Sequence, residues 1–481
     1  MRDLTTGPVR NHLLGMAAPI AAGMLMQTLY YLVDLYFVGR LGDAALAGVG
    51  AAGNVMMIVI ALTQVLGVGT VALIAQAVGR RDAKDANHVF NQSLSIAAVL
   101  GVLTLAGGYA CTDTYLEAVA ADDATVAAGR SYLYWFLPGM ALQFPMVAMI
   151  SALRGTGIVK PTMIVQMATV LLNVVLAPVL IAGWGTARPL GVAGAGLAST
   201  ISVAAGVVLL LVYFRRLEKY VAVDPAQWTP RLSTWRRMLG LGLPAGGEFV
   251  LMFVYVAIIY WLIRDFGATA QAGFGVGQRL MEAVMLPALA LSFAVPAVAG
   301  QNVGANRPDR VRETFRSAAI MSTVLMVALT LLCQLRPLWL VQGFTDDPAV
   351  IEVAAGFLRV ISFNFVPSGL IFICSGMFQA LGNTLPALAS SAGRLLTFAV
   401  PAVWLAGWPA LRVEHVWYLS VASVALQVVT SLLLLRHALA TGVSAEVPAH
   451  ADAVGRDVVA ELAFGEGGEL IREEPARRGA K

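Results

Sequence analysis

The chain contains 481 residues with a formal net charge of +4; 58% of its residues are hydrophobic and only 12% are charged. Its mean hydropathy of +0.77 and its repeated apolar blocks exclude a soluble globular protein and predict a multi-pass membrane protein. We expect membrane lipid around the protein, no nucleic-acid partner and a monomer.

Cysteine and histidine usage gives no sign of a metal or redox site. The three cysteines, Cys111, Cys333 and Cys374, lie within or at the edge of apolar blocks and have no metal-ligand spacing. This argues against a disulfide framework and against a zinc site. None of the five histidines lies in a metalloprotease or catalytic motif. We therefore expect no cofactor and no enzymatic activity.

Twelve membrane-spanning helices are predicted between the turn and charge signals of the sequence, which makes the protein an all-α integral membrane protein. Their ranges are 14–39, 47–78, 89–111, 131–153, 161–183, 192–214, 239–264, 269–303, 315–335, 349–381, 386–408 and 415–436. Lys and Arg concentrate in the N-terminus, the even-numbered connections and the C-terminal tail. The positive-inside rule therefore predicts an inner (plasma) membrane protein with both termini in the cytoplasm.

The first span carries a proline near its start, Pro19, and a carboxylate near its end, Asp34. A carboxylate that faces lipid costs about 2.5–3.5 kcal/mol, so we expect Asp34 to face a protein interior or a water-filled cavity. Pro19 has no amide hydrogen and crowds the carbonyl of Gly15, which predicts a hinge. Gln27 lies about two turns before Asp34 on the same helix face. Tyr30 is a further candidate for the same cavity.

Other polar and charged residues lie inside later spans. Asn173 on the fifth span is expected at a depth that allows contact with the aspartate of the first span. Glu248 on the seventh span either binds substrate or takes part in coupling, or is a solvated or arginine-paired group. Arg279 and Glu282 lie three residues apart on one helix face and are expected to neutralise each other. Arg394 either pairs with Glu248 or extends toward the membrane surface.

The largest connection between spans divides the chain into two six-span halves. It is rich in charged residues, prolines and tryptophans. We assign an N-terminal six-helix lobe to 1–214, a cytoplasmic inter-lobe linker to 215–238 and a C-terminal six-helix lobe to 239–436. The polar composition of 437–481 predicts a cytoplasmic tail that is mostly disordered.

An internal repeat relates the two halves at a constant offset of 225 residues. The offset places Gly15 and Pro19 on Gly240 and Pro244, Gln76 and Gly79 on Gln301 and Gly304, Phe90 on Phe315, and Gly157 and Pro161 on Gly382 and Pro386. Because an even number of spans separates equivalent points, the copies are parallel and related by a pseudo-two-fold axis along the membrane normal. This arrangement predicts a substrate site in a central crevice and makes Pro244 a second candidate hinge.

Three groups of segments carry motifs. They are VDLYFVGRLGDAALAGVG around Asp34, the pair AQAVGRRDAKDANHVF and GQNVGANRPDRVRETF, and the pair LRGTGIVKP and FQALGNTLP. Together they resemble the MATE (multidrug and toxic compound extrusion) family, and the resemblance runs from about Leu13 to Arg436. It implies two six-helix lobes around a V-shaped cleft. It also implies export of cationic amphiphilic compounds driven by inward flow of protons or sodium ions.

The resemblance also implies roles for individual residues. Asp34 matches the coupling aspartate of the first helix, and Pro19 matches the proline at which that helix bends. The fifth-helix motif N-x-x-L-D-P is present here as NVVLAP, so Asn173 is matched but Ala177 replaces an aspartate. A single carboxylate with neutral partners favours protons as the coupling ion, although carbonyl oxygens leave sodium open as an alternative.

These residues suggest a coupling mechanism. Deprotonated Asp34 is expected to favour a cavity that accepts a cationic amphiphile. Protonation from outside would let the first helix bend at Pro19, shrink the cavity and release the compound. Proton and substrate would then weaken each other's binding by the same factor, as linkage requires.

Two other transport functions remain open from the sequence. A flippase for lipid-linked precursors would share the two-lobe architecture but would need a basic central cavity for its polyanionic substrate. A channel would conduct without coupling to a gradient. Transport of ethidium-like cations, binding of lipid-linked pyrophosphates and the presence of coupled export distinguish these functions.

Overall fold

The computed structural model describes residues 1–185 and 187–441 and is built from helices, with no strand in these ranges. Twelve helical segments are long and apolar enough to cross a membrane. The predicted all-α membrane fold is therefore confirmed. The prediction of a disordered tail falls largely on residues 442–481, which lie outside the described residues.

The helices follow one another in chain order with short connections. Their bounds are α1 Val9–Gly39, α2 Asp43–Gly79, α3 Ala83–Val119, α4 Asp123–Gly155, α5 Lys160–Ile181, α6 Val192–Arg216, α7 Leu232–Ile263, α8 Ala268–Gly304, α9 Pro308–Leu335, α10 Pro337–Val341, α11 Pro348–Ile361, α12 Phe365–Leu381, α13 Leu385–Ala406 and α14 Val413–Thr441. Three 3-10 turns, η1 Pro225–Gln227, η2 Arg264–Phe266 and η3 Ser362–Asn364, complete the described part of the chain.

Several predicted spans were too short because polar first turns also fold as helix. The third span, predicted at 89–111, is α3 from Ala83 to Val119. The Asp82 side chain caps α3 by accepting the amide of Asp85 at 2.9 Å, which stabilises a helix start well before the apolar residues begin. The tenth span, predicted as one helix, is divided into α11 and α12 by η3.

The predicted linker and tail are also partly helical. Residues 215–238 include the end of α6 at Arg216 and the start of α7 at Leu232. Helix α14 continues to Thr441, so its last five residues, 437–441, fall in the range predicted as tail. Composition alone placed these boundaries at the first charged residues, although a helix can extend beyond the membrane as long as its backbone hydrogen bonds continue.

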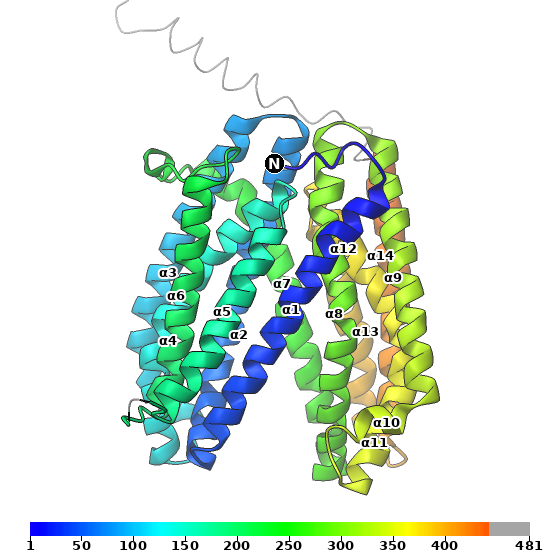
Figure 1. Ribbon diagram of the computed structural model, residues 1–481. Helices are drawn as coiled ribbons and strands as arrows, with labels where there is room; N and C mark the ends of the chain where they lie inside the picture. Colours follow the sequence, from blue (N-terminus) through cyan, green and yellow to red (C-terminus); the bar gives the residue numbers. More distant parts are fainter. Residues whose placement is uncertain (186, 442–481) are drawn as a thin grey trace, which may run out of the picture.

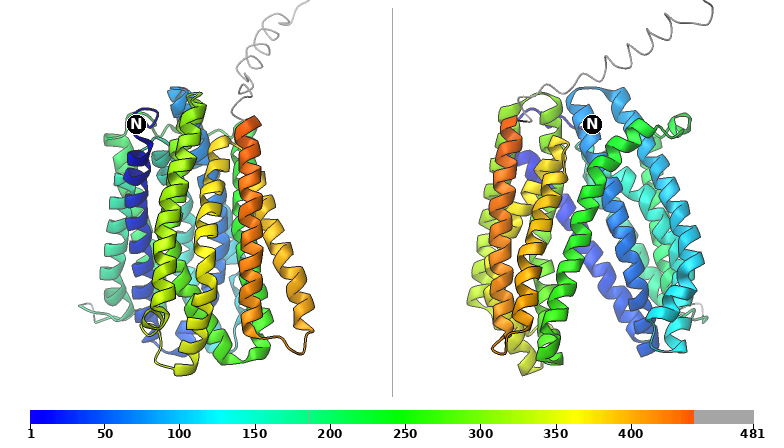
Figure 2. Two further views of the ribbon diagram at one scale, coloured as in Figure 1. Left: turned by 90° about the vertical axis from the view of Figure 1, so that its right-hand side faces the viewer. Right: turned by 180° about the vertical axis from the view of Figure 1, so that it is seen from behind.

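The helices form two bundles that lie side by side (Figure 1). Helices α2 to α6 pack on one another and form what we call the N-bundle, and α8 to α14 form the C-bundle. We call the end of the molecule that carries the N-terminus the N-terminal face. The bundles meet at this face and diverge toward the opposite end in both Figure 1 and the rear view of Figure 2.

Helices α1 and α7 cross between the bundles. The start of α1 packs in one apolar cluster with α8 and α12 through Leu13 and Met16, whereas the helix as a whole also packs against α5 of the N-bundle. Helix α7 makes the equivalent crossing, because it packs against α2 and also against α13. Two long helices, α1 and α7, therefore pack against both bundles and join them.

The closest approach of the two bundles is a reciprocal contact of α2 and α8 at the N-terminal face. A β-carbon at Gly79 would collide with the carbonyl oxygen of Gln301, and one at Gly304 would collide with that of Gln76. The side-chain amide of Gln76 donates to the Ala380 carbonyl at 2.9 Å, and that of Gln301 donates to the Gly155 carbonyl at 3.1 Å. Residues 225 positions apart thus make the same contacts in both directions. We call this contact the seam.

We predict that Gly79→Ala lowers the unfolding temperature of the detergent-solubilised protein by at least a few degrees. The added methyl group must push apart two backbones, and such overpacking costs about 1–3 kcal/mol. Gly53→Ala on the same helix is the matched control, because no atom lies within 4 Å of its added β-carbon and alanine favours helix. Equal unfolding temperatures for the two variants would contradict the close contact at the seam.

Candidate functional site: a central cavity and a buried carboxylate

A cavity of about 390 Å³ lies between the bundles. Eight helices contribute to its lining, namely α1, α2, α4, α5, α6, α7, α8 and α12. Its surface is formed mainly by methionine, aromatic, aliphatic and amide side chains, including Met24, Met146, Met163, Phe136, Phe249, Phe293, Gln64, Gln143, Gln166 and Gln379. Flexible thioethers and aromatic rings suit apolar ligands of varied shape, and neutral amides can orient a polar group.

Two of the predicted cavity residues lie in this lining. Gln27 and Tyr30 both face the cavity from α1. The Gln27 carbonyl oxygen accepts a hydrogen bond from the Gln166 amide at 3.2 Å, which links α1 to α5. The Tyr30 hydroxyl lies 2.6 Å from the Ser199 hydroxyl of α6. Both residues are therefore positioned by the N-bundle.

Asp34 lies one helical turn beyond Tyr30 and is not part of the lining. Its side chain is buried, with 8% of the residue exposed, and its Oδ1 atom has no hydrogen-bond partner. No ion pair within the described residues includes it. A carboxyl group in such a place is either neutral or matched by a bound cation, because an isolated buried charge is very costly.

Asn173 of α5 is fully buried, and neither atom of its amide has a hydrogen-bond partner. No hydrogen bond therefore joins it to Asp34, although α1 and α5 pack together and the sequence suggested contact. Buried polar atoms are nearly always hydrogen-bonded, so two unsatisfied groups on neighbouring helices are unusual. Their unpartnered oxygen atoms are available to bind a proton at Asp34 or to coordinate a cation.

Glu248 of α7 lies outside the lining of the central cavity and is hydrogen-bonded to helices of the C-bundle. It accepts hydrogen bonds from Ser375 of α12 at 2.8 Å and from Ser391 of α13 at 3.5 Å. The Gln427 amide of α14 donates in turn to Ser391 at 3.2 Å. The next residue, Phe249, lines the central cavity, but Glu248 itself does not.

The expected charge pairs inside the membrane are not formed in the described residues. Arg394 stacks over the Tyr255 ring with its guanidinium carbon 4.0 Å from the ring centre, and its Nε atom has no partner. It makes no ion pair with Glu248. Arg279 and Glu282 are both exposed, and Glu282 accepts a hydrogen bond from Gln278 at 3.3 Å instead of pairing with Arg279.

The two candidate hinge prolines differ in their surroundings. Pro19 lies inside α1 and lines the central cavity. Pro244 lies inside α7 and is buried, between two glycines, Gly242 and Gly246, that pack closely against Val65 of α2. Both helices run continuously through their prolines. Pro19 itself lines the cavity, so a bend of α1 at this residue would change the shape of the cavity directly.

The charged residue of the lining, Arg154, was not singled out from the sequence. Arg154 of α4 is half-buried and lines the cavity. Gln379, the residue 225 positions later, also lines the cavity. Arg154 is the one formally charged side chain of this lining. The signal was present in the repeated motif pair LRGTGIVKP and FQALGNTLP, in which the second residues differ in charge.

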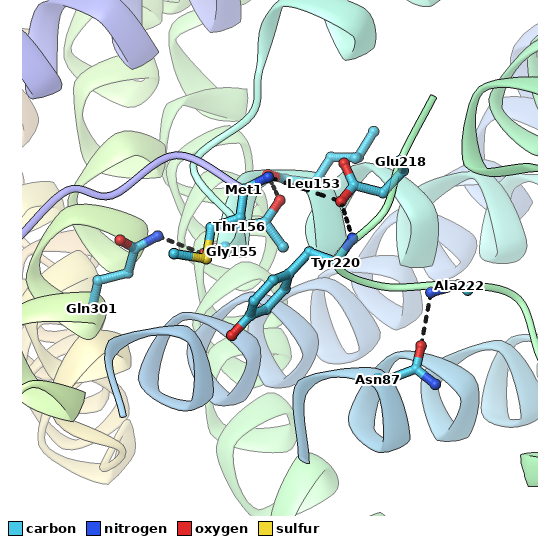
Figure 3. A network of polar contacts seen from close by, with 9 residues as sticks. All are labelled: Met1, Asn87, Leu153, Gly155, Thr156, Glu218, Tyr220, Ala222 and Gln301. Atoms are coloured by element: carbon cyan, nitrogen blue, oxygen red, sulfur yellow. Dashed lines mark hydrogen bonds and ion pairs between the residues drawn. The ribbon is translucent and has the colours of Figure 1, made fainter. Parts of the chain in front are cut away.

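The first residues of the chain close the cavity at the N-terminal face. The Arg2 amide donates to the Thr156 carbonyl of the N-bundle at 2.8 Å. The terminal amino group lies 3.9 Å from Glu218 on the same side (Figure 3). The Leu4 amide donates to Oε1 of Gln301 on the C-bundle at 2.9 Å. This segment therefore bridges both bundles directly beside the seam.

No group of three or more potential metal ligands occurs in the part of the chain that the structure describes. The family model MatE matches the chain twice, over residues 19–179 and 244–405. The chain belongs to the MatE family. The two matches begin 225 residues apart, which is the offset of the internal repeat.

Curated relatives of this MatE protein are named for different transported compounds. It is 26% identical over 412 residues to the probable multidrug resistance protein YoeA of Bacillus subtilis, which covers 83% of this chain and 87% of that protein. It is 26% identical over 384 residues to the multidrug export protein MepA of Staphylococcus aureus, which covers 78% and 82%. An FAD transporter of Shewanella oneidensis is 25% identical over 408 residues, with coverage of 83% and 88%.

Solved structures show the same fold. A MOP superfamily transporter from Pyrococcus furiosus superimposes with a TM-score of 0.85 at 24% identity, covering 92% of this chain and 98% of that one. The fold therefore agrees with the family match. Membership of the MatE family, whose members are membrane transporters, makes this protein a multi-pass membrane transporter and not an enzyme. The comparisons agree with the family resemblance that the motifs carried.

We predict that Asn173→Leu leaves the unfolding temperature in detergent unchanged or raises it, because the substitution removes a buried amide that has no partners. Asn91→Leu should instead lower it markedly. Asn91 is equally buried, but it donates to the Ala222 carbonyl and accepts from the Asp224 amide and the Trp228 indole. Losing these bonds costs about 1–3 kcal/mol. If both variants lost stability equally, Asn173 would have a structural role.

Proposed function

We propose that this protein is a secondary active multidrug efflux transporter that exports amphiphilic compounds, cationic ones included, by antiport with protons. Asp34 is the coupling site, and the two bundles alternate access to the cavity between them. The single observation that carries this proposal is a buried carboxyl group without a partner, one turn beyond a cavity that both bundles line. The relative MepA of Staphylococcus aureus is likewise named as a multidrug export protein.

The proposed coupling acts through α1. When Asp34 is deprotonated, its charge must be compensated, so the helix adopts the position in which water, a cation or polar groups reach it. When it is protonated, it can pack against apolar neighbours. Because Pro19 lies on the same helix and lines the cavity, a bend at Pro19 would convert the change at Asp34 into a change of cavity volume.

Proton is proposed as the coupling ion, with sodium as the alternative. The carboxyl group of Asp34 can bind one proton without further ligands. Sodium requires several oxygen ligands, and Ala177, which is buried in α5, adds no side-chain oxygen where the family motif has an aspartate. Asn173 remains available as one oxygen donor.

The orientation and state of the transporter form part of the same proposal. With both termini in the cytoplasm, the N-terminal face is the cytoplasmic face. The seam and the first residues of the chain close that face, so the structure would represent a form that is closed to the cytoplasm. The transporter is proposed to act as a monomer in the plasma membrane.

The lining argues against a flippase for lipid-linked pyrophosphates. A polyanionic head group would require several positive side chains, whereas the lining carries a single one, Arg154. The remaining lining is apolar or neutral and resembles a pocket for amphiphilic compounds.

We predict that Asp34→Asn abolishes export driven by a pH gradient, because an amide cannot take up and release the proton. The measurement is export of a fluorescent cation from proteoliposomes with an imposed proton gradient, and in a parallel series with an imposed sodium gradient. Asp113→Asn is the matched control. Asp113 is exposed, its Oδ1 atom lies 2.6 Å from Nε of Arg130, and it is not part of the cavity lining.

If the wild type exports the cation under a proton gradient but not under a sodium gradient, the coupling ion is the proton. Export in the sodium series alone would replace proton by sodium. Asp34→Asn protein that still exports at the wild-type rate would refute Asp34 as the coupling site.

A further inference from the structure

Arg154 lies at the end of the cavity nearest the seam. It is the second-last residue of α4, and the carbonyl of its neighbour Gly155 accepts the hydrogen bond of Gln301 across the seam at 3.1 Å. Its repeat equivalent, Gln379, stands beside Ala380, whose carbonyl accepts the corresponding bond from Gln76 at 2.9 Å. Arg154 and Gln379 therefore form a pseudo-symmetric pair in the cavity lining just beneath the closed face.

The guanidinium of Arg154 has no counter-charge in the described residues. It takes part in none of their ion pairs and none of their hydrogen bonds. Its one specific neighbour is the Phe293 ring of α8, at 5.4 Å from the guanidinium carbon to the ring centre. An unpaired cation within a membrane protein is costly, and such residues usually mark a ligand or transport site.

The cavity around Arg154 is neutral. No acidic residue occurs in the lining that the described residues form, and Asp34 and Glu248 both lie outside it. Ser151, one turn earlier on α4, and Gln379 provide uncharged hydrogen-bonding groups in the same lining. The charge of the lining is therefore that of a single guanidinium, which a ligand with one negative group would balance.

The chemistry of arginine defines the ligand group further. A guanidinium presents a planar fork of N–H donors that matches a carboxylate in a bidentate arrangement, and it can do so while its face stacks on an aromatic ring. The guanidinium carbon of Arg154 lies over the Phe293 ring, and no hydrogen bond or ion pair within the described residues uses the N–H groups of Arg154. N–H groups that face a cavity without protein partners are suited to bind a carboxylate.

We propose that Arg154 is a specificity-determining residue of the cavity and binds the carboxylate of those amphiphilic substrates that carry one. The carboxylate lies against Arg154 at the closed end of the cavity, and the apolar part of the substrate extends along Met146 and Met163 toward Tyr30. This inference assigns a binding role to one residue of the cavity and rests on the proposed transport function.

A purely structural role for Arg154 makes a different prediction. If the contact with Phe293 only held α4 against α8, removing the guanidinium would lower the stability of the protein and affect all ligands equally. A carboxylate site instead predicts a loss that is confined to ligands carrying the carboxylate.

The test is equilibrium binding of two fluorescent dyes to the purified full-length protein, measured by fluorescence polarisation in detergent. Rhodamine 110 carries a free carboxylate, and rhodamine 123 is its methyl ester with the same ring system. We expect Arg154→Gln, which introduces the residue found at the equivalent position 379, to weaken binding of rhodamine 110 by roughly tenfold. Binding of rhodamine 123 should change by less than about twofold.

Arg154→Lys provides a second variant that keeps the charge but loses the fork. It should bind rhodamine 110 with an affinity between those of the wild type and Arg154→Gln, which keeps the test decisive if Arg154→Gln fails to fold. Equal weakening of both dyes, together with a lower unfolding temperature, would establish the structural role and overturn the proposal. Unchanged binding of rhodamine 110 in either folded variant would also overturn it.

Binding and transport results separate this inference from the proposed function. Selective loss of rhodamine 110 binding, together with no gradient-driven export by the wild type, would support the carboxylate site and refute the transport function. Gradient-driven export of rhodamine 123 by the wild type, without a selective effect of Arg154→Gln on rhodamine 110, would support the transport function and refute the site.

Discussion

The reciprocal contact of α2 and α8 is the constraint on which the rest of the structure depends. Two glycines, Gly79 and Gly304, let the helix backbones touch, and each faces the carbonyl of the glutamine three residues before the other. The side-chain amides of Gln76 and Gln301 then bond across to the opposite bundle. Only glycine allows this distance, since any β-carbon would collide with a backbone oxygen. The contact fixes where the bundles meet, and so fixes the end at which the central cavity is closed.

The repeat makes the backbone symmetric but leaves the chemistry asymmetric. Tyr30 and Tyr255 occupy equivalent positions, and each hydroxyl bonds to a serine in its own half. The position equivalent to Asp34 is Ile259, which packs in the apolar core of the C-bundle. The titratable group of the second half, Glu248, corresponds to Gly23. The two halves therefore carry these candidate coupling carboxyl groups, Asp34 and Glu248, at different places.

This asymmetry suits a transporter in which two bundles of similar backbone structure have different roles. The N-bundle supplies most of the cavity lining and lies beside the carboxyl group that has no partner. The carboxyl group of Glu248 on α7, in contrast, accepts hydrogen bonds from two serine hydroxyl groups of the C-bundle and lies outside the lining. A buried group without hydrogen-bond partners gains the most free energy from binding a ligand, because it does not have to break an existing hydrogen bond first. The carboxyl group beside the N-bundle is therefore the better candidate for coupling.

The sequence by itself determined the twelve helices and the repeat, and it predicted that Asp34 is shielded from lipid, which its burial confirms. These follow from local physics, because a chain in lipid must satisfy its backbone within each helix and because a lone carboxylate in an apolar run is costly wherever the helix packs. Only the tertiary structure decided that α1 is shared by both bundles, that Asn173 has no partner, that Arg394 stacks on Tyr255 and that Arg154 lines the cavity. These features depend on contacts between helices that are distant in sequence. Several arrangements of such contacts satisfy the same pattern of polar and apolar residues, so the pattern could not select among them.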